Sequence, residues 1–246
     1  MEITAFVETL DREGGLLASA AEKAGTGADV PTCPGWQVRD LLRHTGMVHR
    51  WATAFVAEGH TSYHPDGGLP DLDGDELVAW FREGHQSLVA TLAAAPPDVR
   101  CWHFLPAPSP LAFWARRQAH ETAVHRIDAE SARGGTAAGI DTAFAVDGID
   151  ELLRGMHARP KSAVRTGEPR TLRIRATDAP GAVWTVRLSA EPPVARRTDD
   201  GPADCELTGP AAALYGALWN RRPFPDVTGD RSLAGLWREK SAITWS

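Results

Sequence analysis

Residues 116–130 read RRQAHETAVHRIDAE, and this stretch decides the expected fold. It follows a Ser-Pro pair at 109–110, which is typical of a helix start, and it precedes a Gly-Gly pair at 134–135, which is typical of a helix end. Within it Glu121 and His125 are four residues apart, so a helix places both side chains on one face. The stretch therefore predicts a long helix that presents a carboxylate and an imidazole side by side.

Three further long helices are predicted before this one. Apolar residues recur at helical spacing over residues 4–24 and 36–58, and glycine follows each run. A third helix is predicted over residues 73–95, because Asp73 with a glutamate three residues later forms a start that resembles a capping box. With the helix over 109–132, these segments predict a bundle that contains four long helices.

The sequence pattern changes near residue 160. A fifth helical stretch over 142–157 either closes the bundle or bridges to the next domain, and it ends before Pro160. Apolar and polar residues then alternate with the period of a strand. We expect two domains, a helical bundle over 1–160 and a small α+β domain over 161–246. The elements expected in the second domain are a hairpin (171–176 and 183–189), a third strand (205–208), an apolar helix (210–220) and a closing segment (224–237).

Composition and charge exclude several classes of function. The formal net charge is −6 and the isoelectric point is near 5.8, which argues against nucleic acid as a partner. No stretch approaches 18 consecutive apolar residues, so we expect no membrane span. Cys33, Cys101 and Cys205 lie far apart in the sequence, which predicts neither a disulfide framework nor a thiolate zinc site. The acidic start without a long apolar run predicts a cytoplasmic protein.

His44 lies in the apolar stripe of the helix predicted over 36–58, next to residues such as Leu41. A buried imidazole without a partner costs about 1–3 kcal/mol, so His44 is expected to have one. One interpretation is a core histidine bonded to a backbone carbonyl or a hydroxyl. The other is a metal ligand that joins Glu121 and His125, because two histidines and one carboxylate form a three-ligand zinc site with an open position. Fe²⁺ and Ni²⁺ also suit this ligand set.

The residues around the Glu121/His125 pair have weaker assignments. His120 and Arg126 lie roughly 100° around the helix from the pair, so we expect them to flank the site or face solvent. Asp128 comes three residues after His125, where it orients that imidazole, helps to bind substrate or simply faces solvent.

Two segments of the N-terminal half carry a resemblance to a known family. Residues 34–44, PGWQVRDLLRH, and residues 116–130 resemble the mycothiol-dependent maleylpyruvate isomerase family of the DinB superfamily, in order and in spacing. Residues 207–222, LTGPAAALYGALWNRR, with VTGD at 227–230, are similar to the small sterol-carrier-like second domain of that family. The resemblance thus covers nearly the whole chain.

This resemblance implies a DinB-like up-down four-helix bundle followed by a small α+β domain. It implies a divalent metal, for which we choose Zn²⁺ from the ligand set, held by His44, Glu121 and His125. It also implies that the thiol cosubstrate mycothiol binds as a thiolate at the open position. It also implies an arginine that meets the charge on the substrate carbonyl or carboxylate, for which we choose Arg222, or its neighbour Arg221.

The leading hypothesis is a cytoplasmic isomerase or thiol S-transferase that depends on a metal and on mycothiol. Its active site is expected between the bundle and the C-terminal domain. Its partners are then a small thiol and a small electrophilic substrate with an unsaturated carbonyl or carboxylate group, and the protein is a monomer or a homodimer. The alternative is a small-molecule carrier without catalysis, in which the metal only stabilises the fold. A third hypothesis is a helical scaffold without metal.

Overall fold

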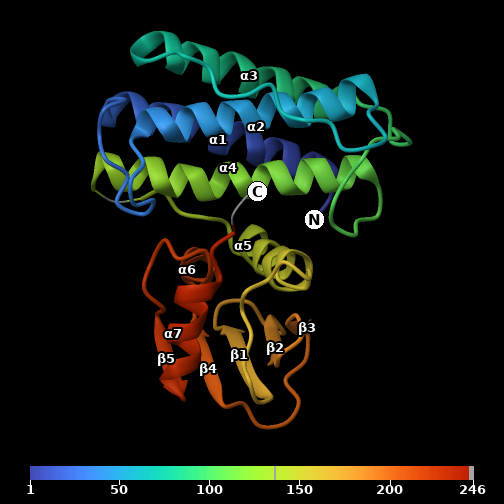
Figure 1. The fold of residues 1–246 in the computed structure, drawn as a ribbon, viewed down its shortest axis with the longest axis vertical. Coiled ribbons are helices and arrows are strands. Elements are labelled where there is room, and N and C mark those ends of the chain that lie inside the picture. The colour runs from blue at the N-terminus through green and yellow to red at the C-terminus, as the bar shows by residue number, and fades with distance from the viewer. Residues whose placement is uncertain (136, 244–246) are drawn as a thin grey trace. The chain divides into compact units, whose positions relative to one another are not determined.

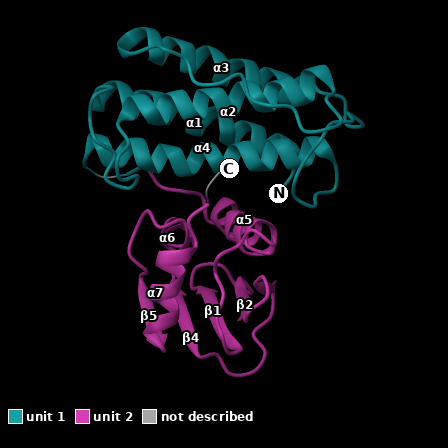
Figure 2. Ribbon diagram, in the orientation of Figure 1, with its two compact units in different colours: residues 1–137 teal, residues 138–246 magenta. Residues whose placement is uncertain are grey.

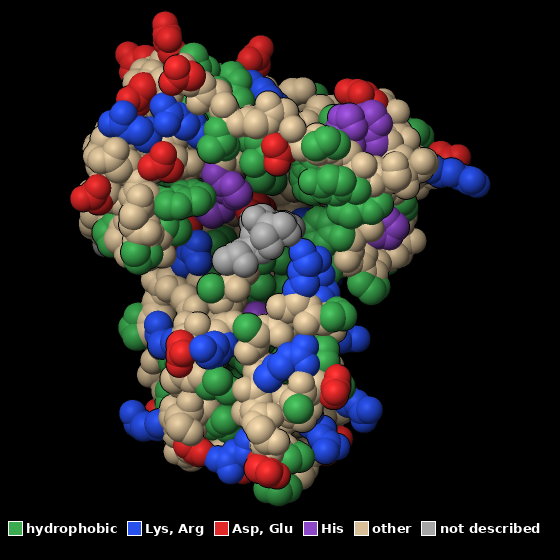
Figure 3. Space-filling view, viewed as in Figure 1, with side chains coloured by type: hydrophobic (Ala, Val, Ile, Leu, Met, Phe, Trp, Pro, Cys, Tyr) green, Lys and Arg blue, Asp and Glu red, His purple; other side chains and the backbone are tan. Residues whose placement is uncertain are grey.

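The computed structural model describes residues 1–135 and 137–243, which form two compact units, Met1–Ala137 and Ala138–Ser246 (Figures 1 and 2). The first unit is helical, and the second combines helices with a five-stranded sheet. On the face of the molecule in Figure 3, Lys and Arg side chains are interspersed with Asp and Glu side chains over both units. None of the described helices has the length and apolar character needed to span a bilayer.

The first unit confirms the predicted four-helix bundle (Figure 1). The structure confirms Asp73 and Ser109 as the residues that precede the third and fourth helices. The Ser109 side chain accepts a hydrogen bond from the Ala112 amide, as expected of a cap, whereas the Asp73 side chain accepts one from the adjacent Gly74 amide instead of forming the predicted capping box. The helices are α1 (Ile3–Ala24), α2 (Val38–Glu58), α3 (Gly74–Ala94) and α4 (Pro110–Arg133).

The order of the helices around the bundle differs from their order in the chain. Helix α1 packs against α4 and α3, and α2 packs against α3 and α4, whereas α1 and α2 barely touch. Going around the bundle, the order is therefore α1, α4, α2, α3. The connection over residues 25–37 crosses the bundle diagonally. This arrangement places α2 beside α4.

The side of α4 that faces α1 is buried and polar, which contradicts the solvent-facing position that the sequence analysis allowed for His120 and Arg126. His120 is fully buried, and its ring lies edge-on to Phe6 on α1 with the ring centroids 6.0 Å apart. Arg126 is also fully buried and forms ion pairs with Glu13 on α1 and with Glu130. Neither residue faces solvent or the Glu121/His125 side, because α4 is enclosed by α1 on one side and by α2 on another.

The second unit is built on a mixed sheet with the strand order β3-β2-β1-β4-β5. Strand β1 pairs antiparallel with β2 and parallel with β4, which confirms the predicted hairpin and third strand. Strands β3 and β5 were not predicted, because they are only three and four residues long. The elements are α5 (Thr142–Glu151), a π-helical turn (Leu152–Met156), β1 (Arg170–Ala176), β2 (Val183–Leu188), β3 (Val194–Arg196), β4 (Cys205–Gly209), α6 (Ala211–Leu218), β5 (Asp226–Gly229) and α7 (Arg231–Lys240).

Helix α5 packs against α6, and the π-helical turn packs against β3. The boundary between the two units therefore follows residue 137, whereas the sequence pattern placed it after residue 160. Helical periodicity alone gives no reason to separate α5 from the bundle, since α5 is as amphipathic as a bundle helix.

Two adjacent glycines in α1 provide a test of the packing between α1 and α3. A Cβ at position 14 would overlap the imidazole ring of His85, which is itself buried, whereas a Cβ at position 15 would meet nothing within 4 Å. Replacing an exposed mid-helix glycine by alanine stabilises a helix by about 1 kcal/mol. We therefore expect Gly15→Ala to raise the free energy of unfolding by about that amount, and Gly14→Ala to lower it by about 1–3 kcal/mol through overpacking. Urea unfolding monitored by circular dichroism measures both, and an equal stabilisation by the two substitutions would contradict the packing.

A buried histidine in the second unit should make stability depend on pH. Burial lowers the pKa of His157 to about 4, while its Nδ1 lies 3.1 Å from the Ser162 hydroxyl and its ring lies edge-on to Trp237. Since the unfolded chain binds a proton at this residue near pH 6.5 and the folded chain does not, stability falls as the pH drops from about 6.5 towards 4.

We expect His157→Asn, which can still form a hydrogen bond with Ser162 but cannot titrate, to remove on the order of 2–3 kcal/mol of the loss in unfolding free energy over that pH range. The measurement is the free energy of unfolding in urea at a series of pH values, compared with the unsubstituted protein. Parallel pH profiles for the two proteins would show that His157 is not held in its neutral form.

Candidate metal centre

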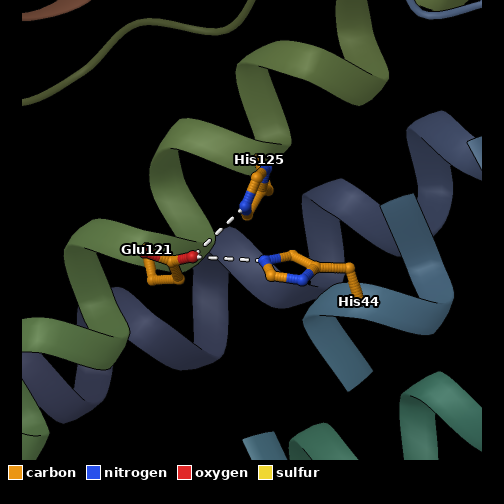
Figure 4. A group of neighbouring side chains, drawn as sticks. All are labelled: His44, Glu121 and His125. Carbon is orange, nitrogen blue, oxygen red and sulfur yellow. Dashed lines mark ion pairs between the residues drawn. The ribbon is translucent and has the colours of Figure 1, made fainter. Parts of the chain in front are cut away.

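Helices α2 and α4 bring together the three side chains that the sequence analysis grouped (Figure 4). The Glu121 Oε1 atom lies 3.6 Å from His44 Nε2 and 3.3 Å from His125 Nε2. One possible ligand atom from each residue lies within 4.8 Å of the other two. Among the described residues, these three form the group of histidine, cysteine and acidic side chains that is compact enough to hold a metal ion.

The spacing of these atoms fits a divalent cation. Nitrogen and oxygen ligands about 2.1 Å from a tetrahedral zinc ion lie about 3.4 Å from one another. The two separations of 3.3 and 3.6 Å that involve Glu121 are close to that value. The side chains are also partly accessible, with 17% of His44, 8% of Glu121 and 10% of His125 exposed. The group therefore has donors that suit a divalent cation, and His44 is its most exposed member.

A hydrogen-bond chain holds the imidazole of His125. Its Nδ1 lies 2.9 Å from Asp128 Oδ2, and the other oxygen of Asp128 accepts a hydrogen bond of 2.6 Å from the Thr32 hydroxyl. Asp128 is fully buried. Because Nδ1 faces this carboxylate, that nitrogen carries a proton, and Nε2 is turned towards Glu121. Of the roles that the sequence left open for Asp128, these contacts favour the orientation of His125.

The Glu121 carboxylate has a buried counter-charge that the sequence analysis missed. Arg117 lies one turn earlier on α4, is 1% exposed, and donates from Nη2 to Glu121 Oε2 over 3.2 Å. Burial alone would raise the pKa of Glu121, but hydrogen bonds from His125 and His44 and the charge of Arg117 outweigh burial and hold this pKa well below its usual range. Arg117 precedes Glu121 by four residues, and this helical spacing was the sequence signal from which the pair could have been predicted.

The same charges act on His125 in the absence of an ion. Burial opposes its charged form, but hydrogen bonds with Asp128 and Glu121 and the charges of these two carboxylates raise the pKa of His125 to about 9. Both nitrogens of His125 face carboxylates, and these two carboxylates stabilise the charged form of the ring.

An aromatic side chain covers the two imidazoles. The Trp36 ring is stacked on His125, with centroids 6.4 Å apart and planes at 15°, and it meets His44 edge-on at 5.3 Å. The two imidazoles are perpendicular to each other, with centroids 5.2 Å apart. Trp36 belongs to the connection that precedes α2 and is half-buried. It therefore packs against both imidazoles from outside the helices.

His49 shows what the other interpretation of His44, a core histidine bonded to a hydroxyl, looks like in this bundle. His49 on α2 is fully buried, and its Nε2 lies 2.8 Å from the Thr122 hydroxyl, as expected for a core histidine with a hydroxyl partner. Burial lowers the pKa of His49 well below its usual value. His44, in contrast, is partly exposed and faces the Glu121 carboxylate.

Arg221 and Arg222, of which one was predicted to bind the charged group of the substrate, lie in the second unit, in the turn after α6. The side chain of Arg222 is exposed, and its backbone carbonyl accepts a hydrogen bond from Arg238. Arg221 donates from Nη1 to the Trp219 carbonyl over 2.8 Å. The role of Arg222 in substrate binding stays a prediction.

Comparison with solved structures places the fold among known proteins. The chain is similar to a crystal structure of a mycothiol-dependent maleylpyruvate isomerase, with a TM-score of 0.62, 14% identity, and 93% of this chain and 92% of that chain covered. A histidine-to-alanine mutant of a mycothiol-dependent maleylpyruvate isomerase gives a TM-score of 0.61 and 13% identity, with 90% of each chain covered. No curated protein sequence matches the chain.

Family models account for most of the sequence. The model described as the mycothiol maleylpyruvate isomerase N-terminal domain matches residues 7–130, which include all three residues of the candidate metal centre. The model described as the MDMPI C-terminal domain matches residues 143–236, in the second unit. The chain therefore belongs to the mycothiol-dependent maleylpyruvate isomerase family.

Proposed function

We propose that this protein is an isomerase or thiol S-transferase that depends on a divalent metal, for which we choose Zn²⁺, and on mycothiol. The observation that carries the proposal is the Glu121 carboxylate oxygen, which lies within 3.6 Å of the Nε2 atoms of His44 and His125. Membership of the family supports the thiol and the isomerase chemistry. The proposed substrate is a small electrophile with an unsaturated carbonyl or carboxylate group.

His44, Glu121 and His125 would hold the metal through Nε2, Oε1 and Nε2. Bound there, Zn²⁺ supplies the Lewis acidity that keeps a thiol at the remaining position in its thiolate form near neutral pH. Asp128 keeps a proton on Nδ1 of His125, and Arg117 balances the charge of Glu121. Following the family resemblance, we assign to Arg222 the role of binding the negatively charged group of the substrate.

The isomerisation itself follows from thiol chemistry. A thiolate that adds to a conjugated double bond converts it into a single bond, about which the substrate turns. The thiolate then leaves and the double bond forms again, so no oxidant or reductant is consumed. Transfer of the thiol to another electrophile would use the same first step and omit the last.

The alternative hypothesis of a carrier with a structural metal requires a closed coordination shell. Structural zinc sites take four protein ligands, whereas catalytic sites take three and leave one position open. The compact group in the described residues has three members, which favours catalysis over the carrier hypothesis.

The first prediction concerns the metal. We expect the purified protein to bind one equivalent of zinc, and His44→Ala to lose nearly all of it while the bundle stays helical, because packing of the helices carries most of their stability. Elemental analysis and circular dichroism measure the two properties. The control is His64→Ala, an exposed loop histidine that stacks on His60, and it should keep its zinc. Full zinc content in His44→Ala would remove His44 from the site.

The second prediction concerns the thiol. In the zinc-loaded protein we expect mycothiol to add a zinc–sulfur distance of about 2.3 Å, which X-ray absorption at the zinc edge detects. An S-methylated mycothiol, which cannot form a thiolate, serves as the control. A bound zinc without this sulfur distance would reject the thiol while leaving the metal in place. Conversion of maleylpyruvate to its trans isomer, which requires both components, then tests the isomerase activity itself.

A further inference from the structure

We infer that Thr32 is a positioning residue for the metal centre, acting through Asp128 on His125; this inference rests on the proposed function. Thr32 lies in the connection between α1 and α2, 96 residues from Asp128 in the sequence. Its hydroxyl donates to Asp128 Oδ1 over 2.6 Å, while Asp128 Oδ2 lies 2.9 Å from His125 Nδ1. Three side chains from two parts of the fold thus form one chain of hydrogen bonds that ends at a proposed metal ligand.

The hydroxyl limits the rotation of the Asp128 carboxylate. Asp128 and His125 are on the same helix, three residues apart, so the backbone alone leaves the carboxylate free to turn about its last side-chain bond. A hydrogen bond to one oxygen fixes the plane of the carboxylate and thereby the position of the other oxygen. Ser131 supports this arrangement, because its hydroxyl donates to the Asp128 backbone carbonyl and lies 3.1 Å from the Thr32 hydroxyl.

The backbone around Thr32 is held by short-range hydrogen bonds. The Val30 amide donates to the Trp36 carbonyl, the Cys33 amide donates to the Val30 carbonyl, and the Trp36 amide donates to the Cys33 carbonyl, over 2.9 to 3.0 Å. Thr32 therefore sits in a compact turn rather than in an open loop. The same turn ends at Trp36, which packs on His125 and His44. One turn thus contacts the metal centre directly through Trp36 and indirectly through the bond from Thr32 to Asp128.

The consequence concerns which of the two ring nitrogens of His125 carries the proton. A carboxylate that is held against Nδ1 keeps the proton on that nitrogen and leaves the lone pair of Nε2 for the metal. Loss of the Thr32 hydroxyl removes one of the contacts that fix the plane of the carboxylate, so that the imidazole is held less firmly in the orientation that suits the metal. Partners of this kind change metal affinity by about 10- to 100-fold when they are removed.

The test compares zinc affinities by competition with a chromophoric chelator. We expect Thr32→Val to bind zinc about tenfold more weakly than the unsubstituted protein, and Thr32→Ser, which keeps the hydroxyl, to recover most of the affinity. The matched control is Thr53→Val on α2, whose hydroxyl donates to the His49 carbonyl, and it should leave the affinity unchanged. Circular dichroism and urea unfolding confirm that each variant is folded.

A spectroscopic readout separates positioning from general destabilisation. In the zinc-loaded protein the ¹⁵N resonances of the His125 ring report which nitrogen carries the proton, and we expect the Nδ1 proton to exchange faster with water in Thr32→Val than in Thr32→Ser. Equal affinities and equal exchange in Thr32→Val and the unsubstituted protein would overturn the role of Thr32 and leave the proposed metal site standing. An unsubstituted protein that binds no zinc would overturn both.

Discussion

The contact between α2 and α4 is the constraint on which the candidate site depends. Glu121 and His125 are one turn apart on α4 and share a face by helical geometry, but they reach His44 only because α2 lies beside α4. For α2 to pack beside α4, the chain must cross the bundle between the end of α1 and the start of α2. The crossing segment also carries Trp36, which packs on His125, and Thr32, which donates a hydrogen bond to Asp128. The connection that sets the helix order therefore also supplies side chains that surround the candidate site.

Helix α4 carries many charged side chains in a buried position, and each of those described above has a partner. Arg117 pairs with Glu121, Asp128 pairs with His125, and Arg126 pairs with Glu13 and Glu130. A buried charge without a partner is strongly destabilising, so these pairs are a condition for the helix to fold in this place. They also hold the side chains in fixed orientations, which a metal site needs. The same polar residues therefore serve the packing of the bundle and the geometry of the centre.

Family membership and site geometry support different parts of the proposed function. The solved structures share only 13–14% identity with this chain, and at that level they establish the fold alone. The family models identify the kind of chemistry. The two distances from Glu121 Oε1 to His44 Nε2 and His125 Nε2 provide the physical argument for a metal, because they are close to the separation of ligand atoms around a tetrahedral ion. In the proposed function, the thiol would take the position that three protein ligands leave open.

The sequence by itself determined the helices, the hairpin and the three candidate ligands. Helical periodicity, the caps at Asp73 and Ser109 and the spacing of Glu121 and His125 are local signals, and local signals survive in a single sequence. Only the tertiary structure decided which way the remaining polar residues face. His120 and Arg126 turn towards α1, Thr32 reaches Asp128 across 96 residues, and α5 joins the second unit. These outcomes depend on which elements pack together, and that choice is made by the sum of many weak contacts between distant segments, which no short pattern records.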